Sequence, residues 1–428
     1  MRLMNSKLKS SKIFLGLSSF QILAMFRRGL FYTYLSIYFR SYLSLTVTET
    51  TLYATLPMIM SVIFQNFVWG PISDKFQRRR TLIISGEILA GIGTILVWFI
   101  HYGFTNLFLA GYVIIFGLSC IEIFWSMSNI GWSALISDLY PSLQRSKVMG
   151  QLTSIGGLGR IVGISIGGLL YDNGLGFRDG SLFFVASFVM FISTLPMLFT
   201  PEGGISLKKE PEIKEAITDQ PPKNYKIIFT IFIISLIFIN FGRNSISIPY
   251  SQYLTLESGF GVNSIVLSYI ANTRSVAVLL IGYSAGFLSK KFGHSKTLIL
   301  GSSLSIAALF ITALSPNLLL IYVGSFLIGT GEVIITASSY AIASDLIPER
   351  FRAKLFGVYN TTFFLSWGLA CTLISAPIID LLIFQGFDEV FAYMISFLVG
   401  AFITLIGLII FIILELIMII KKKSEKKF

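Results

Sequence analysis

Eight charged side chains lie inside long apolar stretches of the sequence, where charges are rare. They are Arg27, Arg28, Glu87, Glu122, Arg160, Arg243, Arg274 and Glu332. A charge at the centre of a bilayer costs about 2.5–3.5 kcal/mol on insertion scales, so such residues are by default functional. An arginine fork holds a phosphate or carboxylate through two hydrogen bonds, and a buried carboxyl can exchange a proton. These residues therefore predict the binding of an anionic solute, with the acids as candidates for proton coupling.

Arg28 and Arg243 form the most informative pair. The triplets Phe26-Arg27-Arg28 and Phe241-Gly242-Arg243 place them at equivalent positions of two similar halves of the chain. Residues at helical spacing extend this candidate substrate site: Tyr32 near Arg28, Asn240 and Tyr250 on the face of Arg243, and Trp125 and Asn129 on the face of Glu122. The alternative interpretation is packing between helices with satisfied polar groups, and it suits the tryptophans better.

The depth of each charge follows from the helical rise of about 1.5 Å per residue, counted from the cytoplasmic end of its span. This count places six charges in one slab near the middle of a hydrocarbon core roughly 30 Å thick. They are Arg28, Glu122, Arg160, Arg243, Arg274 and Glu332. Glu87 lies seven residues from Arg80 and is predicted to be shallow and structural.

Pairing cannot neutralise this slab of charges. It holds four arginines and two acids, so pairs such as Glu122 with Arg160, and Glu332 with an arginine of the facing half, still leave two cations over. That surplus favours an anionic substrate. A neighbouring arginine that moves can switch the protonation of a buried acid. The candidate coupling residues are therefore Glu122, Glu332, Arg160 and Arg274.

The apolar stretches that carry these residues predict an all-α integral membrane protein. Of the 428 residues, 54% are hydrophobic and 13% charged, against about 45–50% and 25% in soluble proteins. The stretches run unbroken for about 20 residues, which indicates helices and excludes the alternating strands of a barrel. We expect twelve transmembrane helices, at 13–39, 51–72, 81–102, 106–136, 148–171, 182–200, 227–250, 263–289, 297–314, 317–344, 354–382 and 390–420.

The distribution of cations predicts the topology. Twenty-six of the 33 Lys and Arg residues fall in the N-terminus, alternate loops and the tail on one side, and only Arg40 and Arg178 on the other. By the positive-inside rule, both termini are cytoplasmic and the protein lies in the cell membrane. The net charge of +12 is interpreted as attraction to anionic membrane lipid and not to nucleic acid, because the cations are scattered over seven short segments.

An internal repeat divides the chain into two six-helix halves. They cover 1–200 and 227–428, the second with a basic cytoplasmic tail, and a polar linker at 201–226 joins them. Residues 137–141 (SDLYP) align without gaps on 344–348 (SDLIP) at an offset of 207. Two repeated halves around a midplane site are a transporter architecture.

The loop after the second span carries a charged motif formed by Gly70, Asp74, Lys75, Arg78, Arg79 and Arg80. The motif resembles the Gly-x-Leu-Ala-Asp-Arg-x-Gly-Arg-Arg signature of the major facilitator superfamily, although Gln77 replaces a glycine and the second copy has Lys290 in place of the aspartate. The resemblance covers the whole chain and implies a twelve-helix carrier that moves a small solute by alternating access. We expect Asp74 to accept hydrogen bonds from a helix N-terminus and the arginines to pair with Asp138, which would gate the cytoplasmic side. The alternative is a loop that only satisfies topology and turn geometry.

One branch of the superfamily, the organophosphate/phosphate antiporters, places one arginine from helix 1 and one from helix 7 on the phosphate. Arg28 and Arg243 resemble that pair, which implies an organic anion as substrate. The alternative is a proton-coupled efflux pump for hydrophobic or cationic compounds, with Glu122 and Glu332 as key residues. The glycines of span 5 resemble a glycine-rich antiporter motif, and close helix packing explains them equally well. A non-transporting membrane sensor is the alternative of another class.

Metal, redox and enzymatic chemistry are not expected. Cys120 and Cys371 lie in apolar runs and are interpreted as small buried hydrophobes, whereas His101 and His294 lie outside the middle of the spans and cannot form a metal site there. We predict no catalytic residue, no metal and no cofactor. The expected partners of this monomer are a small-molecule substrate, a proton or counter-solute, and membrane lipid.

Overall fold

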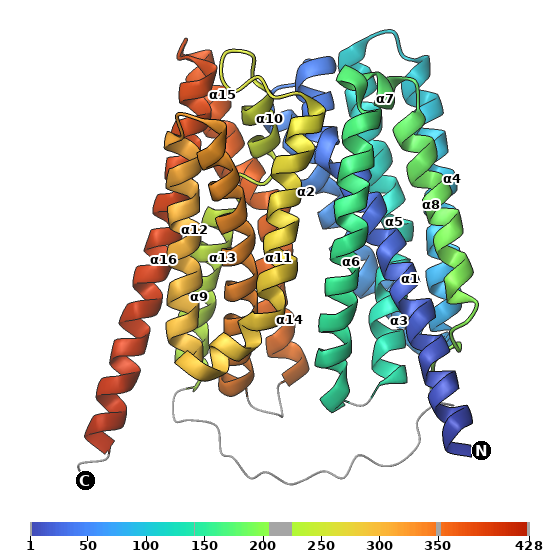
Figure 1. The fold of residues 1–428 in the computed structure, drawn as a ribbon, viewed down its shortest axis with the longest axis vertical. Coiled ribbons are helices and arrows are strands. Elements are labelled where there is room, and N and C mark those ends of the chain that lie inside the picture. Colours follow the sequence, from blue (N-terminus) through green and yellow to red (C-terminus); the bar gives the residue numbers. More distant parts are fainter. Residues whose placement is uncertain (1, 141, 205–224, 348–351, 426–428) are drawn as a thin grey trace. The chain divides into compact units, whose positions relative to one another are not determined.

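The computed structural model describes residues 2–140, 142–204, 225–347 and 352–425, and every regular element in these ranges is a helix (Figure 1). The chain forms two compact units. Unit 1 consists of Met1–Ile213 with Asn263–Asn272, and unit 2 of Lys214–Val262 with Thr273–Phe428. Most of the predicted linker, 205–224, lies outside the described residues.

The helices of unit 1 follow the first six predicted spans. They are α1 (Arg2–Ile37) with the π-helical turn η1 (Tyr38–Tyr42), α2 (Val47–Phe64) with η2 (Gln65–Trp69) and α3 (Gly70–Phe76), α4 (Arg79–Gly103), α5 (Leu107–Leu139), α6 (Ser142–Leu170), the short η3 (Asp172–Gly174) and α7 (Leu175–Arg178), and α8 (Ser181–Met197). A capping box starts α2, because the Thr46 hydroxyl accepts the Glu49 N–H at 3.2 Å and the Glu49 carboxylate accepts the Thr46 N–H at 2.9 Å.

The remaining helices follow the last six predicted spans. They are α9 (Tyr225–Asn244) with α10 (Pro249–Thr255), α11 (Ser264–Phe292), α12 (His294–Leu314), α13 (Leu318–Leu346), α14 (Arg352–Ala370) with η6 (Cys371–Ser375) and α15 (Ala376–Phe384), and α16 (Glu389–Glu425). The seventh span is broken between Asn244 and Pro249. Side chains of η6 bind two backbone carbonyls at this break: the Cys371 thiol donates to Asn244 O at 3.3 Å, and the Ser375 hydroxyl donates to Ser245 O.

The all-α membrane fold is confirmed. Ten helices in the described ranges are long and apolar enough to cross a membrane, and an eleventh span results when the bent pair Asp172–Arg178 and Ser181–Met197 is counted as one. The remaining predicted span is α1, whose hydropathy is lowered by Arg27 and Arg28.

Helix α1 packs closely on α6 within unit 1 (Figure 1). A Cβ atom added at Gly159 would lie 2.1 Å from Ile22 O, and one added at Gly163 would lie 2.0 Å from Phe26 O. The glycines of span 5 therefore let the two backbones touch, which is the packing interpretation of this stripe. The contact at Phe26 fixes α1 directly beside its two arginines.

Candidate substrate site

Arg27 and Arg28 are adjacent on α1 and face different surroundings. Arg27 is buried and forms an ion pair with Glu87 of α4, and the Ser128 hydroxyl of α5 donates to the same carboxylate at 2.9 Å. The Arg27 guanidinium carbon also lies 4.5 Å from the centroid of the Trp125 ring. Glu87 therefore lies beside Arg27 and balances its charge.

Arg28 is exposed and forms no hydrogen bond or ion pair with any residue that the structure describes. Glu122 of α5 lies close enough to interact with it electrostatically without forming an ion pair. Tyr32, one turn along α1, is half-buried, and its ring centroid lies 6.2 Å from that of Trp125. Two predicted site residues, Tyr32 and Trp125, thus lie close together in unit 1, with Arg28 one helical turn from Tyr32.

The surroundings of Glu122 come from α1, α2 and α4. Its carboxyl group accepts a hydrogen bond from the Ser61 hydroxyl of α2, and the charges that act on it include Arg28, Arg27 and Glu87. The Trp69 indole donates to Ile123 O at 2.7 Å, which anchors the π-helical turn η2 on α5 next to Glu122. Asn129, half-buried, lies two turns further along α5.

In unit 2, Arg243 is buried and its Nε donates to Asn240 Oδ1 at 3.0 Å. Asn240 in turn donates to the Thr362 hydroxyl of α14 at 3.3 Å, and the Arg243 guanidinium carbon lies 5.9 Å from the centroid of the Phe363 ring. No acid in the described ranges forms an ion pair with Arg243. Tyr250 was predicted on the same helical face, but it lies in α10, after the break that ends α9 at Asn244. That part of the predicted face therefore does not form.

The second deep ion pair joins Arg274 of α11 to Glu332 of α13. Nη2 of Arg274 lies 2.7 Å and Nε lies 3.1 Å from the same Glu332 oxygen, and both side chains are partly exposed. This partner of Glu332 therefore belongs to its own half, whereas the alternative of structural ion pairing placed an arginine of the facing half beside it. Two of the deep arginines, Arg27 and Arg274, are balanced by acids, whereas Arg28 and Arg243 are not.

The motif loop forms a network at one end of unit 1. Arg79 is buried, and its Nε and Nη2 atoms lie 3.2 Å from Asp138 Oδ2 and 3.3 Å from Asp74 Oδ1. The structure thus contains the expected contact between a loop arginine and Asp138. Asp74 differs from expectation, because it contacts Arg79 and its side chain is 82% exposed. Helix α3 begins at Gly70 and ends before Gln77, which adopts the left-handed conformation (φ 56°) that a glycine would favour. Lys75 and Arg78 of the same motif are exposed.

Glu202 completes this network and was missed by the sequence reasoning. Its carboxylate accepts the Thr81 N–H at 2.9 Å and lies 3.2 Å from Nε of Arg80, so it caps α4, which has no side-chain cap of its own. The Gly204 N–H donates to Asp138 at 2.9 Å, and Gly203 and Gly204 both have positive φ angles. The Pro-Glu-Gly-Gly sequence at 201–204 was the available signal.

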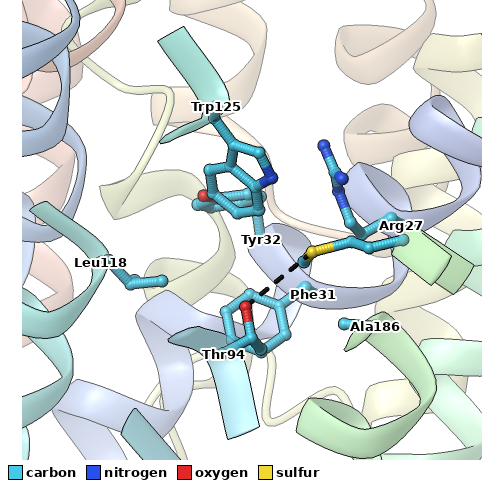
Figure 2. Close-up of a pocket in the computed structure, with 8 residues that line it drawn as sticks. Arg27, Phe31, Tyr32, Thr94, Leu118, Trp125 and Ala186 are labelled. Atoms are coloured by element: carbon cyan, nitrogen blue, oxygen red, sulfur yellow. Dashed lines mark hydrogen bonds between the residues drawn. The ribbon is translucent and has the colours of Figure 1, made fainter. Parts of the chain in front are cut away.

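A narrow pocket lies within unit 1 between α1, α4, α5 and α8 (Figure 2). Arg27 is the charged residue of its lining. The other side chains that line it are mainly aromatic or apolar and include Phe31, Tyr32, Leu118, Trp125 and Met190. No group of three or more His, Cys, Asp or Glu residues in the described ranges could hold a metal ion. Cys371 is buried as predicted, whereas Cys120 is exposed.

Comparison with known proteins connects this architecture to carriers. The sequence profile of the Major Facilitator Superfamily matches residues 17–371 and 232–427. The chain is 25% identical over 311 residues to Multidrug resistance protein MdtG of Rahnella sp. (strain Y9602), covering 72% of each protein, and 24% identical over 313 residues to MdtG of Escherichia coli (strain K12 / DH10B), again covering 72% of each.

Solved structures share the fold at lower sequence identity. A point mutant of the nucleoside transporter NupG superposes with a TM-score of 0.73 at 14% identity, covering 94% of this chain and 99% of that one. A bacterial homologue of the human lysosomal transporter Spinster gives 0.70 at 16% identity, covering 95% and 97%. The profile match over both halves, together with this shared fold, shows that the chain belongs to the major facilitator superfamily and is a multi-pass membrane transporter, not an enzyme.

Proposed function

We propose that this transporter carries a small organic anion and that Arg28 binds the anionic group. The observation that carries the proposal is the contrast between two neighbours: Arg27 is neutralised by Glu87, whereas Arg28 has no hydrogen bond or ion pair among the described residues and is exposed. A guanidinium inside a membrane span is costly unless a counter-charge is present, and a bound phosphate or carboxylate supplies one through a bidentate contact.

Arg243 is the proposed equivalent in unit 2. It also lacks an acidic ion-pair partner in the described ranges, and its bond to Asn240 holds the side chain in place while leaving the charge unbalanced. The sequence equivalence of Arg28 and Arg243 supports this assignment. The resemblance to organophosphate/phosphate antiporters remains a prediction, because the matched relatives carry a different name.

Aromatic side chains near Arg28 support a substrate with an apolar part. Tyr32 lies one turn from Arg28, its ring centroid is 6.2 Å from that of the buried Trp125, and Asn129 lies further along α5. The relatives that are called multidrug resistance proteins support export as the direction of transport. The proposed substrate is therefore an amphipathic organic anion.

Transport is proposed to proceed by alternating access with a proton or counter-solute. Glu122 and Glu332 are the proposed proton carriers, Arg160 and Arg274 their electrostatic partners in coupling, and the loop network of Asp74, Arg79 and Asp138 the cytoplasmic gate. We propose a monomer in the cell membrane with both termini in the cytoplasm, on the basis of the cation distribution.

Export of hydrophobic cations is the second candidate function. Glu122 favours it, because this half-buried carboxyl group has only a hydroxyl partner and forms no ion pair with any described residue. A cationic substrate would neutralise Glu122 in the way that an anion neutralises Arg28.

A thermal-shift screen of the purified protein separates the two functions. Phosphate esters, aromatic carboxylates and cationic dyes are compared on the wild type, Arg28→Gln and Glu122→Gln, since a ligand that binds only the folded state raises the unfolding temperature. The proposal expects stabilisation by at least one class of anion, abolished in Arg28→Gln and retained in Glu122→Gln. Stabilisation by cations alone, lost in Glu122→Gln, would replace it by the second function.

A further inference from the structure

Two buried hydrogen-bond donors line the pocket in unit 1 without an acceptor. They are Nε of Arg27 and Nε1 of Trp125, in residues that are 5% and 6% exposed, and no group in the described part of the chain accepts from them. A buried donor without an acceptor has lost its hydrogen bond to water and gained none, so each such group in a native structure calls for an explanation. Figure 2 shows the indole nitrogen of Trp125 on the side of its ring that faces Arg27. Both residues with an unpaired donor thus line the same pocket.

The missing acceptor must be uncharged. The ion pair with Glu87 already balances Arg27, and the Ser128 hydroxyl satisfies the other carboxylate oxygen. A second anion here would leave a net negative charge in a low-dielectric interior, which costs several kcal/mol, whereas a carbonyl oxygen adds no charge. This separates the pocket from Arg28, whose charge is unbalanced.

The walls define the group that carries the acceptor. Phe31, Leu118 and Met190 are almost fully buried, and the Thr94 hydroxyl already donates to Ala90 O at 2.8 Å. Apart from the two orphan donors the lining thus offers contacts suited to an aromatic ring or a branched alkyl group. The thioether of Met190 and the half-buried Tyr32 are the side chains able to give way when such a group enters.

We propose that this pocket is a subsite for one uncharged carbonyl group carried on an aromatic or branched apolar part of the substrate. The Arg27 and Trp125 N–H groups donate to its oxygen. In this conformation the pocket has no room for a water molecule, so the group enters only when lining side chains such as Met190 move aside. The inference rests on the proposed transport function for the remainder of the substrate, whose anionic group binds Arg28.

The indole N–H signals of the five tryptophans test the subsite by ¹⁵N-resolved NMR of the full chain in nanodiscs. Three probes are titrated: acetophenone, ethylbenzene, which lacks the oxygen, and benzoate, which is charged. Trp125→Phe assigns the Trp125 signal. Trp132→Phe is the matched control, because Trp132 lies on the same helix outside the pocket, packed on Phe20 at 5.1 Å. Acetophenone is expected to shift the Trp125 signal saturably, with at least tenfold weaker binding of the other two probes.

Arg27→Lys supplies the second variant, because it keeps a cation for Glu87 and removes Nε. It is expected to abolish the preference for acetophenone over ethylbenzene. Equal responses to these two probes, or no response of a well-dispersed Trp125 signal to acetophenone, would overturn the subsite. Arg28→Gln should leave the acetophenone shift unchanged. If acetophenone does not bind as expected while anion binding still depends on Arg28, only this inference is refuted. If acetophenone binds as expected while anion binding does not depend on Arg28, only the proposed function is refuted.

Discussion

Arg27 and Arg28 are neighbours on α1, and the packing around them separates their roles. Consecutive residues on a helix point about 100° apart, so when α6 fixes the backbone at Phe26, one guanidinium turns towards Glu87 and the other does not. Sequence spacing predicted that Arg28 matters. It could not assign Arg27, because the rotation of a helix about its axis is set by its neighbours.

Removing the Glu87 charge is predicted to destabilise the protein. Glu87→Gln leaves the Arg27 guanidinium buried without a counter-charge, which costs about 3–5 kcal/mol in comparable buried pairs. The unfolding temperature in detergent should fall clearly, and Arg27→Gln in the same chain should recover part of the loss. Wild-type stability in both the single and the double variant would show that the pair carries no such energy.

At the scale of elements, the helices were predictable because their apolar runs are long, whereas their interruptions were not. Pro249, which lacks an N–H, marks the break after Asn244 locally, but the bonds from Cys371 and Ser375 that complete it come from far away in the sequence. The cap that Glu202 provides for α4 is equally non-local. The spacing of apolar residues does not report such contacts between remote segments. The prediction of one continuous helical face from Arg243 to Tyr250 was therefore wrong, because the helix is broken between them.

The contact between α1 and α6 gives a matched pair of glycine substitutions. Gly163→Ala places a Cβ atom against Phe26 O and is predicted to cost about 1–3 kcal/mol through overpacking. Gly150→Ala, on the same helix with nothing within 4 Å, should be neutral or gain about 0.5–1 kcal/mol. Unfolding temperatures in detergent compare them. Equal stability of the two variants would contradict the close approach at Phe26.

The capping role of Glu202 predicts a local effect. Glu202→Gln weakens the acceptor for the Thr81 N–H and removes the ion pair with Arg80, so α4 should lose about 0.5–2 kcal/mol at its first turn. Hydrogen exchange at Thr81 is expected to accelerate several-fold, whereas the Arg80 N–H, which donates to the backbone carbonyl of Glu202 at 3.3 Å, keeps its acceptor. Glu257→Gln, at an exposed acid in another segment, is the control. Unchanged exchange at the Thr81 amide would refute the cap.

At the scale of the whole molecule, composition and the internal repeat predicted a membrane transporter, and the resemblance of the loop motif at 70–80 identified the family correctly. The sequence profile and the shared folds confirm a major facilitator transporter. The substrate is not readable at this scale, because carriers of this fold include proteins with quite different names, from a nucleoside transporter to multidrug resistance proteins.

The cation distribution makes a prediction about the molecule as a whole. Green fluorescent protein fused after Phe428 should fluoresce, and alkaline phosphatase at the same position should be inactive, because both termini are expected in the cytoplasm. Active phosphatase with a dark fluorescent fusion would invert the predicted topology.

Transport itself gives the most direct test of the central claim that Arg28 binds the anionic group of the substrate. Proteoliposomes of the wild type, Arg28→Lys, Arg28→Gln and Glu122→Gln are compared for counterflow of the best anion from the thermal-shift screen. We predict that Arg28→Gln abolishes counterflow while the protein stays folded, and that Arg28→Lys, which keeps the charge and loses the fork, retains a small fraction. Wild-type counterflow in Arg28→Gln would contradict the account.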